Sequence, residues 1–137
     1  MGRCVEQADM TKDIFVFGSN LAGRHGKGAA KFAREHFGAE YGVGEGLTGD
    51  SYALPTKDEN LQTRSLREIQ TSLVKLAECA FYHPSFNFNL TPIGCGLAGY
   101  TQELMIELVM KANMPDNVYL TAEWEPKYIR RYHDPTD

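Results

Sequence analysis

Three glycines, Gly94, Gly96 and Gly99, lie in the stretch Pro92 to Thr101, which reads Pro-Ile-Gly-Cys-Gly-Leu-Ala-Gly-Tyr-Thr. A largely apolar run that predicts a buried strand, residues 86–93, precedes this stretch, and a predicted helix begins where it ends. A glycine-rich connection of this kind can leave successive backbone N–H groups free, and the helix N-terminus adds partial positive charge. The missing side chains permit a phosphate to approach closely. The stretch therefore predicts an anion-binding loop, and a tight turn without a ligand is the alternative.

Another glycine-rich segment, residues 18–28, lies earlier in the chain and connects another predicted strand to another predicted helix. Its Asn20 could hydrogen-bond a ribose or a base edge, or it could satisfy its own backbone in a turn. Arg24 and His25 could meet a pyrophosphate, or they could be solvated loop side chains. The segment is neither a Walker A loop nor a dinucleotide-binding fingerprint, because the glycine spacing of both motifs is absent. Two such loops together favour a nucleotide-like ligand.

Two further residues could act as nucleophiles. Lys57 follows a third predicted strand, residues 51–55, and a lysine beside an anion site could attack an aldehyde-like carbon. An ordinary exposed lysine is the alternative. Cys95 could be a thiolate at a helix N-terminus, but no histidine stands near it in the sequence to serve as its base. The sequence therefore favours Cys95 as a small residue that fills the loop.

The elements that must position these residues alternate along the chain. Predicted strands cover residues 14–17, 51–55, 87–93 and 117–121, and predicted helices cover 29–37, 66–80 and 101–112. Ser65 and Glu68 have capping-box spacing at the start of the second helix, and Pro55 is expected to end its strand or to place it at an edge. Residues 39–50, rich in glycine, are expected to form a loop that is mobile or ordered by a ligand. This order predicts an α/β domain with helices on both faces of a mixed, mostly parallel central sheet, and ligands bind beyond the carboxyl ends of such strands.

Size and composition narrow the class of protein. A chain of 137 residues suits one domain, in which residues 1–12 and 122–137 are expected to be peripheral. The net charge of -4 argues against a general nucleic-acid or membrane-surface binder. The start of the chain lacks an apolar signal core. Cysteines at positions 4, 79 and 95 are scattered, which favours reduced thiols and a cytoplasmic protein, with no metal or cofactor expected. The sequence does not indicate an oligomeric state.

With these motifs, the sequence resembles the macrodomain family, and most of all the branch that contains the terminal ADP-ribose protein glycohydrolase. The resemblance spans residues 13–121 and is carried by Gly26-Lys27-Gly28-Ala29-Ala30, by Tyr52-x-Leu54-x-Thr56-Lys57 and by Pro92-Ile93-Gly94-Cys95-Gly96-Leu97. It implies a three-layer α/β/α sandwich that binds ADP-ribose in a crevice beyond the strands.

The resemblance also implies roles for particular residues. One loop would wrap the diphosphate and the distal ribose with Gly94, Cys95, Gly96, Leu97, Ala98, Gly99 and Tyr100. Residues 20–28, with Asn20, Gly26 and Gly28, would line the other side. In the glycohydrolase branch a lysine matching Lys57 attacks the anomeric carbon, and an aspartate assists from the position that Ala98 occupies here.

The sequence therefore predicts binding of ADP-ribose, a related nucleotide or an ADP-ribosylated protein. The alternatives are a deglycosylase that uses Lys57, a phosphatase acting on ADP-ribose 1''-phosphate, and a domain whose pocket is vestigial. His25 is the second candidate catalytic residue.

Overall fold

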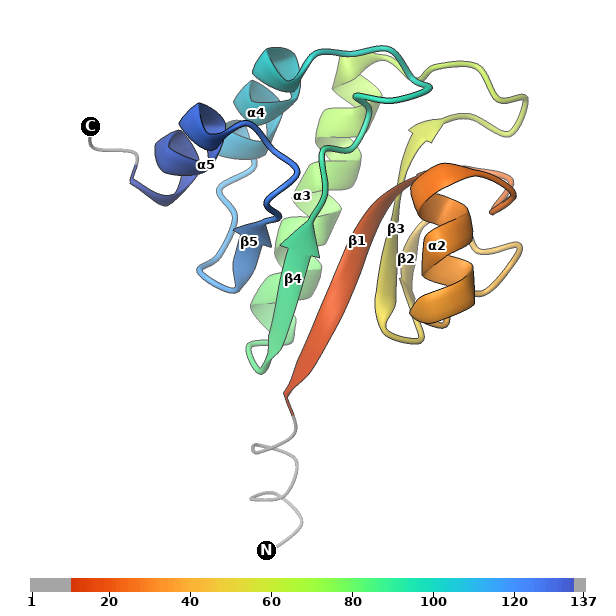
Figure 1. The fold of residues 1–137 in the computed structure, drawn as a ribbon, viewed down its shortest axis with the longest axis horizontal. Helices are drawn as coiled ribbons and strands as arrows, with labels where there is room; N and C mark the ends of the chain where they lie inside the picture. Colours follow the sequence, from red (N-terminus) through yellow and green to blue (C-terminus); the bar gives the residue numbers. More distant parts are fainter. Residues whose placement is uncertain (1–10, 135–137) are drawn as a thin grey trace, which may run out of the picture.

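The computed structural model describes residues 11–134, which form a five-stranded sheet with helices on both faces (Figure 1). Strand β1 (Lys12–Asn20) is central, and β3 (Ser51–Lys57) and β4 (Phe86–Leu90) flank it in parallel. Strand β5 (Val118–Leu120) extends the sheet in parallel beyond β4, whereas β2 (Gly46–Thr48) pairs antiparallel with the outer side of β3. The expected mixed, mostly parallel sheet is confirmed.

The helices form two unequal layers. Helix α2 (Gly28–His36) covers one face of the sheet, while α3 (Leu66–Tyr82) and α4 (Gln102–Lys111) cover the other, and α5 (Pro126–His133) packs beside α4 (Figure 1). Strand β1 packs against both helix layers because its successive side chains point to opposite faces of the sheet. Its Ile14 and Val16 belong to the larger core with α3 and α4, whereas Phe17 belongs to a smaller core with Ala30 and Ala33 of α2. The three-layer α/β/α architecture is therefore confirmed.

The start of α3 follows directly from the sequence. The Ser65 hydroxyl oxygen accepts the backbone N–H of Glu68 at 3.1 Å, and the Glu68 carboxylate accepts the backbone N–H of Ser65 at 3.0 Å. Both halves of the capping box are present, so two N–H groups of the first turn that have no partner inside the helix are satisfied. Behind this cap, a stripe of residues at helical spacing is fully buried against the sheet: Ile69, Leu73, Leu76 and Ala80.

Two strand ends differ from the prediction. Strand β4 ends at Leu90, because the N–H of Ile93 turns back to the carbonyl of Thr91 at 2.7 Å instead of continuing the ladder. Strand β3 passes through Pro55 and ends at Lys57. Strand β2 pairs with β3 only as far as Ala53, so Pro55 lies where that side of β3 has no strand partner and a missing N–H is tolerated.

The glycine-rich segment 39–50 contains β2 and packs against the first loop through its backbone. A Cβ on Gly23 would lie 2.3 Å from the carbonyl carbon of Gly42, and a Cβ on Gly44 would lie 2.5 Å from the carbonyl oxygen of Asn20. The N–H of Gly42 also donates to the carbonyl of Gly23 at 2.8 Å. The expected loop therefore contains a short strand, and backbone contacts join this segment to the first loop.

The C-terminal part of the chain contributes to the core. Trp124 is fully buried and its indole N–H donates to the carbonyl of Leu90 at 2.8 Å. The Tyr132 hydroxyl donates to the carbonyl of Val118 at 2.7 Å, so α5 is fastened to the outer strand of the sheet. Residues 1–10, with Cys4, and residues 135–137 lie outside the described part of the chain. Between residues 11 and 134, none of the helices is long and apolar enough to cross a membrane.

Candidate functional site

The carboxyl ends of β1, β3 and β4 meet at one end of the sheet, and the two glycine-rich loops and Lys57 follow these ends (Figure 1). A Cβ on Gly18, near the end of β1, would lie 3.7 Å from the backbone nitrogen of Gly94 and 3.6 Å from the hydroxyl oxygen of Thr56. The fold therefore brings together the first loop (residues 20–28), Lys57 and the second loop (residues 91–101).

The second loop presents free hydrogen-bond donors. The N–H of Gly99 donates to the carbonyl of Gly96 at 3.0 Å, and the N–H of Tyr100 donates to the carbonyl of Gly94 at 2.8 Å. The backbone N–H groups of Gly96, Leu97 and Ala98 make no hydrogen bond with any residue from 11 to 134. Successive free N–H groups in a turn are the kind of donor set that anion-binding sites use.

The glycines of this loop differ in whether the backbone conformation requires glycine. Gly94 has a φ of +75°, which a side chain disfavours, so the turn itself requires glycine there. Gly96 lacks a positive φ, and a Cβ at this position would meet no atom within 4 Å. Gly26 in the first loop shares both properties. Neither the backbone conformation nor the packing of residues 11–134 requires glycine at these two positions, so the space above each loop is open to a ligand.

The helix that follows the second loop adds less positive charge than the sequence suggested. The Thr101 hydroxyl oxygen accepts the N–H of Leu104 at 3.2 Å and so caps α4, and Glu103 places a carboxylate in the first turn. The free donors of the second loop are therefore the N–H groups of the loop itself, with little addition from the capped helix. Helix α2 has no side-chain cap, and no partner within residues 11–134 accepts from the N–H groups of Gly28, Ala29 and Ala30.

Lys57 is the last residue of β3 and is half-buried. It lies opposite Asn20 of β1 and pairs with Thr63 in an isolated bridge, and the Thr63 hydroxyl donates to the carbonyl of Ala98 at 3.1 Å. One residue therefore connects Lys57 to the position where the resemblance implies an acid. The neighbouring Asp58 carboxylate accepts two backbone N–H groups of its own turn, both at 2.9 Å.

The Asn20 side chain serves its own turn. Its amide nitrogen donates to the carbonyl of Arg24 at 3.0 Å, and its amide oxygen accepts the N–H of Arg24 at 3.0 Å. This pair of bonds is the alternative that the sequence left open, in which Asn20 shapes the first loop.

His25, a residue of the first loop, is completely buried. Its ring lies edge-on to Phe17, with centroids 5.3 Å apart, and near Tyr41 at 6.1 Å. Neither ring nitrogen has a hydrogen-bond partner among residues 11–134. Burial lowers the pKa of His25, with Arg34 contributing in the same direction and the backbone of Val43 opposing it, so the ring stays neutral near pH 7. Proton transfer by His25 would require the loop to open.

Cys95 is half-buried, and its thiol donates to the carbonyl of Ile93 at 3.5 Å. Burial raises the pKa of Cys95 to about 11, so the thiol remains protonated at neutral pH. This environment favours the loop-filling role over a nucleophilic one.

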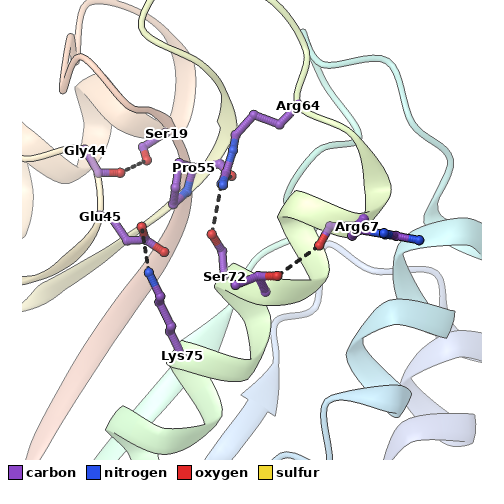
Figure 2. A network of polar contacts seen from close by, with 9 residues as sticks. Ser19, Gly44, Glu45, Pro55, Arg64, Arg67, Ser72 and Lys75 are labelled. Carbon is purple, nitrogen blue, oxygen red and sulfur yellow. Dashed lines mark hydrogen bonds and ion pairs between the residues drawn. The ribbon is translucent and has the colours of Figure 1, made fainter.

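Arg64, which sequence reasoning missed, joins the parts of this site. Its guanidinium donates to the carbonyl of Pro55 at 2.8 Å and to the hydroxyl of Ser72 at 2.9 Å, and Figure 2 shows it reaching across to both. Its own carbonyl accepts the hydroxyl of Tyr100 at 2.7 Å. No helix or strand period signals these contacts, because Pro55, Ser72 and Tyr100 lie in three different parts of the fold, 9, 8 and 36 residues from Arg64.

Two hollows of about 290 and 430 Å³ flank residues 113–116, beyond the C-terminal end of α4 and away from both loops. The smaller hollow has a mainly apolar lining that includes Val74 and Phe81, whereas the larger one is more polar and includes Asp116 and His133. The free donors and the candidate nucleophile therefore gather at the opposite end of the sheet.

The chain matches no protein-family model and no curated protein sequence. Its structure is similar to the macrodomain of Thermus aquaticus DarG, with a TM-score of 0.63 and 18% identity over 85% of this chain and 99% of that one. It is also similar to alphavirus P23pro-zbd, with a TM-score of 0.65 and 15% identity over 93% of this chain and 22% of that one. A third similar structure is Thermosipho africanus DarTG in complex with ADP-ribose, with a TM-score of 0.54 and 18% identity over 84% of this chain and 42% of that one. The chain therefore has the macrodomain fold, as its sequence resemblance implies.

Proposed function

We propose that this protein binds ADP-ribose where the first and second loops meet. The observation that carries the proposal is the run of free N–H groups at Gly96, Leu97 and Ala98. A diphosphate supplies the anionic oxygens that such donors take, and the open space at Gly96 lets a phosphate approach the backbone. The complex of Thermosipho africanus DarTG with ADP-ribose, which shares the fold, supports this class of ligand.

Calorimetry with ADP-ribose and with adenosine, which lacks the diphosphate, tests this proposal. We expect the wild-type protein to bind ADP-ribose much more tightly than adenosine. Gly96→Val should weaken ADP-ribose binding at least about tenfold, or ~1.4 kcal/mol, because the side chain occupies the space of the phosphate. The thermal midpoint serves as the control and should hardly change, since a Cβ at Gly96 meets no neighbour. Unchanged affinity in a folded Gly96→Val protein would place the ligand elsewhere.

Hydrolysis of an ADP-ribosyl bond is the second candidate function, favoured by the position of Lys57 at the carboxyl end of β3 beside the second loop. In this reaction the Lys57 amine would add to the anomeric carbon of the ribose as the bond to the acceptor breaks, and the acceptor would leave with the electron pair of that bond. Water would then release the ribose from the lysine and complete the hydrolysis. A carboxylate usually handles the protons of such a step, and Ala98 cannot. Turnover by the wild-type protein should therefore be weak or absent. The phosphatase alternative lacks comparable support, because His25 is buried.

Ala98→Asp should raise this turnover by up to the ~10²–10⁴-fold that one positioned acid or base contributes. The measurement is single-turnover release of ADP-ribose from a glutamate peptide carrying mono-ADP-ribose. Lys57→Ala is the control and should abolish release and borohydride trapping in both backgrounds, while ADP-ribose affinity stays within about tenfold. Rapid release by the wild-type protein that Ala98→Asp fails to improve would show that another group supplies the acid.

A further inference from the structure

The connection between β3 and α3, residues 58–65, contacts both β3 and the second loop. On one side it pairs with β3, because Thr63 bridges to Lys57 and the N–H of Arg64 donates to the carbonyl of Thr56 at 2.9 Å. On the other side it makes two hydrogen bonds to the second loop, from the Thr63 hydroxyl to the carbonyl of Ala98 at 3.1 Å and from the Tyr100 hydroxyl to the carbonyl of Arg64 at 2.7 Å. Among residues 11–134, these two are the only hydrogen bonds that join residues 94–100 to the chain outside the second loop.

The hydrogen bond from Thr63 orients the peptide group between Ala98 and Gly99, which closes the turn that contains the free N–H groups. The peptide unit between Ala98 and Gly99 carries both the carbonyl that accepts from Thr63 and the N–H that donates to the carbonyl of Gly96 at 3.0 Å. A peptide unit is planar, so bonds to its two ends hold the whole plane in one orientation. The turn of residues 96–99, which contains the three free N–H groups, therefore keeps its shape through a contact with the connection from β3.

The connection is itself anchored to rigid elements. The Arg64 guanidinium bonds Pro55 of β3 and Ser72 of α3, and Figure 2 shows the side chain spanning the space between these two elements. Tyr100 is half-buried, and its hydroxyl is already engaged with Arg64. A hydroxyl in this state serves the protein scaffold rather than a ligand.

We infer that Tyr100 and Thr63 are positioning residues, which hold the free N–H groups of residues 96–98 at a fixed place relative to Lys57. The inference rests on the proposed binding of ADP-ribose and extends it, because it assigns the shape of the diphosphate site to residues outside the loop. Preorganised donors bind an anion more tightly, since the loop loses less freedom when the ligand arrives.

A matched pair of variants tests the inference. Tyr100→Phe removes the hydroxyl bond to Arg64, and Tyr132→Phe removes a hydroxyl bond of the same length and type, 2.7 Å to the carbonyl of Val118, in a part of the protein remote from the site. Both variants should lose similar stability. Calorimetry should show ADP-ribose binding about five- to tenfold weaker in Tyr100→Phe and unchanged in Tyr132→Phe. Thr63→Val and its control Thr71→Val, whose hydroxyl bonds the carbonyl of Arg67 within α3, provide an independent second pair.

The outcomes separate the inference from the function on which it rests. A wild-type protein that does not bind ADP-ribose contradicts the proposed function. A wild-type protein that binds, with Tyr100→Phe no weaker than Tyr132→Phe, overturns the positioning role. Amide chemical shifts of the ligand-free proteins provide a measurement that does not depend on global stability. The resonances of residues 96–98 should shift in Tyr100→Phe and Thr63→Val but not in their controls, and identical resonances in all four would also overturn the inference.

Discussion

The two glycine-rich loops of this protein look alike in the sequence and differ in the structure. In the first loop, Gly23 lies against the backbone of Gly42 and Val43, which leaves no room for a Cβ. In the second loop, Gly96 faces open space beside free N–H groups. At Gly23 the missing side chain lets backbone pack on backbone, whereas at Gly96 it leaves open space beside free donors. A cluster of glycines therefore does not identify a binding loop unless the surroundings of each Cβ are known.

The largest expected effect tests the close backbone contact at Gly23. Gly23→Ala should lower the free energy of unfolding by about 3–5 kcal/mol, because the added methyl group would overlap the backbone of Gly42 and Val43. Gly28→Ala is the matched control, since Gly28 also has a positive φ, +56°, but a Cβ there meets no atom within 4 Å. It should cost about 1 kcal/mol from backbone strain alone. Urea denaturation of both variants provides the measurement, and equal losses would show that the close approach of the two backbones is not maintained in solution.

A smaller effect tests whether the first loop also contributes to ligand binding. Gly26 has the same open surroundings as Gly96, although it lies in the same loop as Gly23. Gly26→Val should leave the thermal midpoint nearly unchanged and weaken ADP-ribose binding about fivefold, or ~1 kcal/mol, because the valine would narrow the space between the loops. Calorimetry of this variant beside Gly96→Val compares the two loops directly. If only Gly96→Val binds more weakly, the ligand contacts the second loop alone.

The smallest effect concerns the buried His25 of the first loop. Burial lowers the pKa of His25, so the unfolded chain binds a proton more readily than the folded protein as the pH falls. Folding stability should therefore decrease on acidification through the ordinary histidine range near pH ~6.5. His25→Phe should reduce the drop in thermal midpoint between pH 7.5 and pH 5.5 by a few degrees. His36→Gln, a change at an exposed histidine of α2, is the control. If the thermal midpoint falls equally in the wild-type protein and in His25→Phe, His25 is not buried in its neutral form.

Several parts of the fold could be predicted from the sequence because their causes are local. The serine–glutamate pair that starts α3 forms both bonds of the capping box. Alternating strands and helices predicted the parallel sheet and the end at which both loops meet. These features depend on residues a few positions apart, or on rules for the connections between elements.

Other parts depend on contacts that no local pattern shows. Strand β2 is three residues long and begins with Gly46, so it has too few residues to display a strand period. The backbone contact between Gly23 and Gly42, and the bond from Tyr100 to Arg64, join residues that are distant in the sequence. The burial of His25 follows from the aromatic rings around it, which only the fold brings together.

The central place of β1 in the sheet affects how the chain folds. Strands β1, β2 and β3 and helix α2 all lie between residues 12 and 57, and β1, β3 and α2 share a small core. The pairing of these strands therefore needs only short loops to close. The other side of β1 pairs with β4, where Asp13 meets Asn87, 74 residues away. Closing so long a loop is slow, so we expect this pairing to form late on the folding pathway. Substitutions in β4, β5 or Trp124 should therefore accelerate unfolding more than they retard refolding, which makes the C-terminal half the part of the chain that determines the lifetime of the native state.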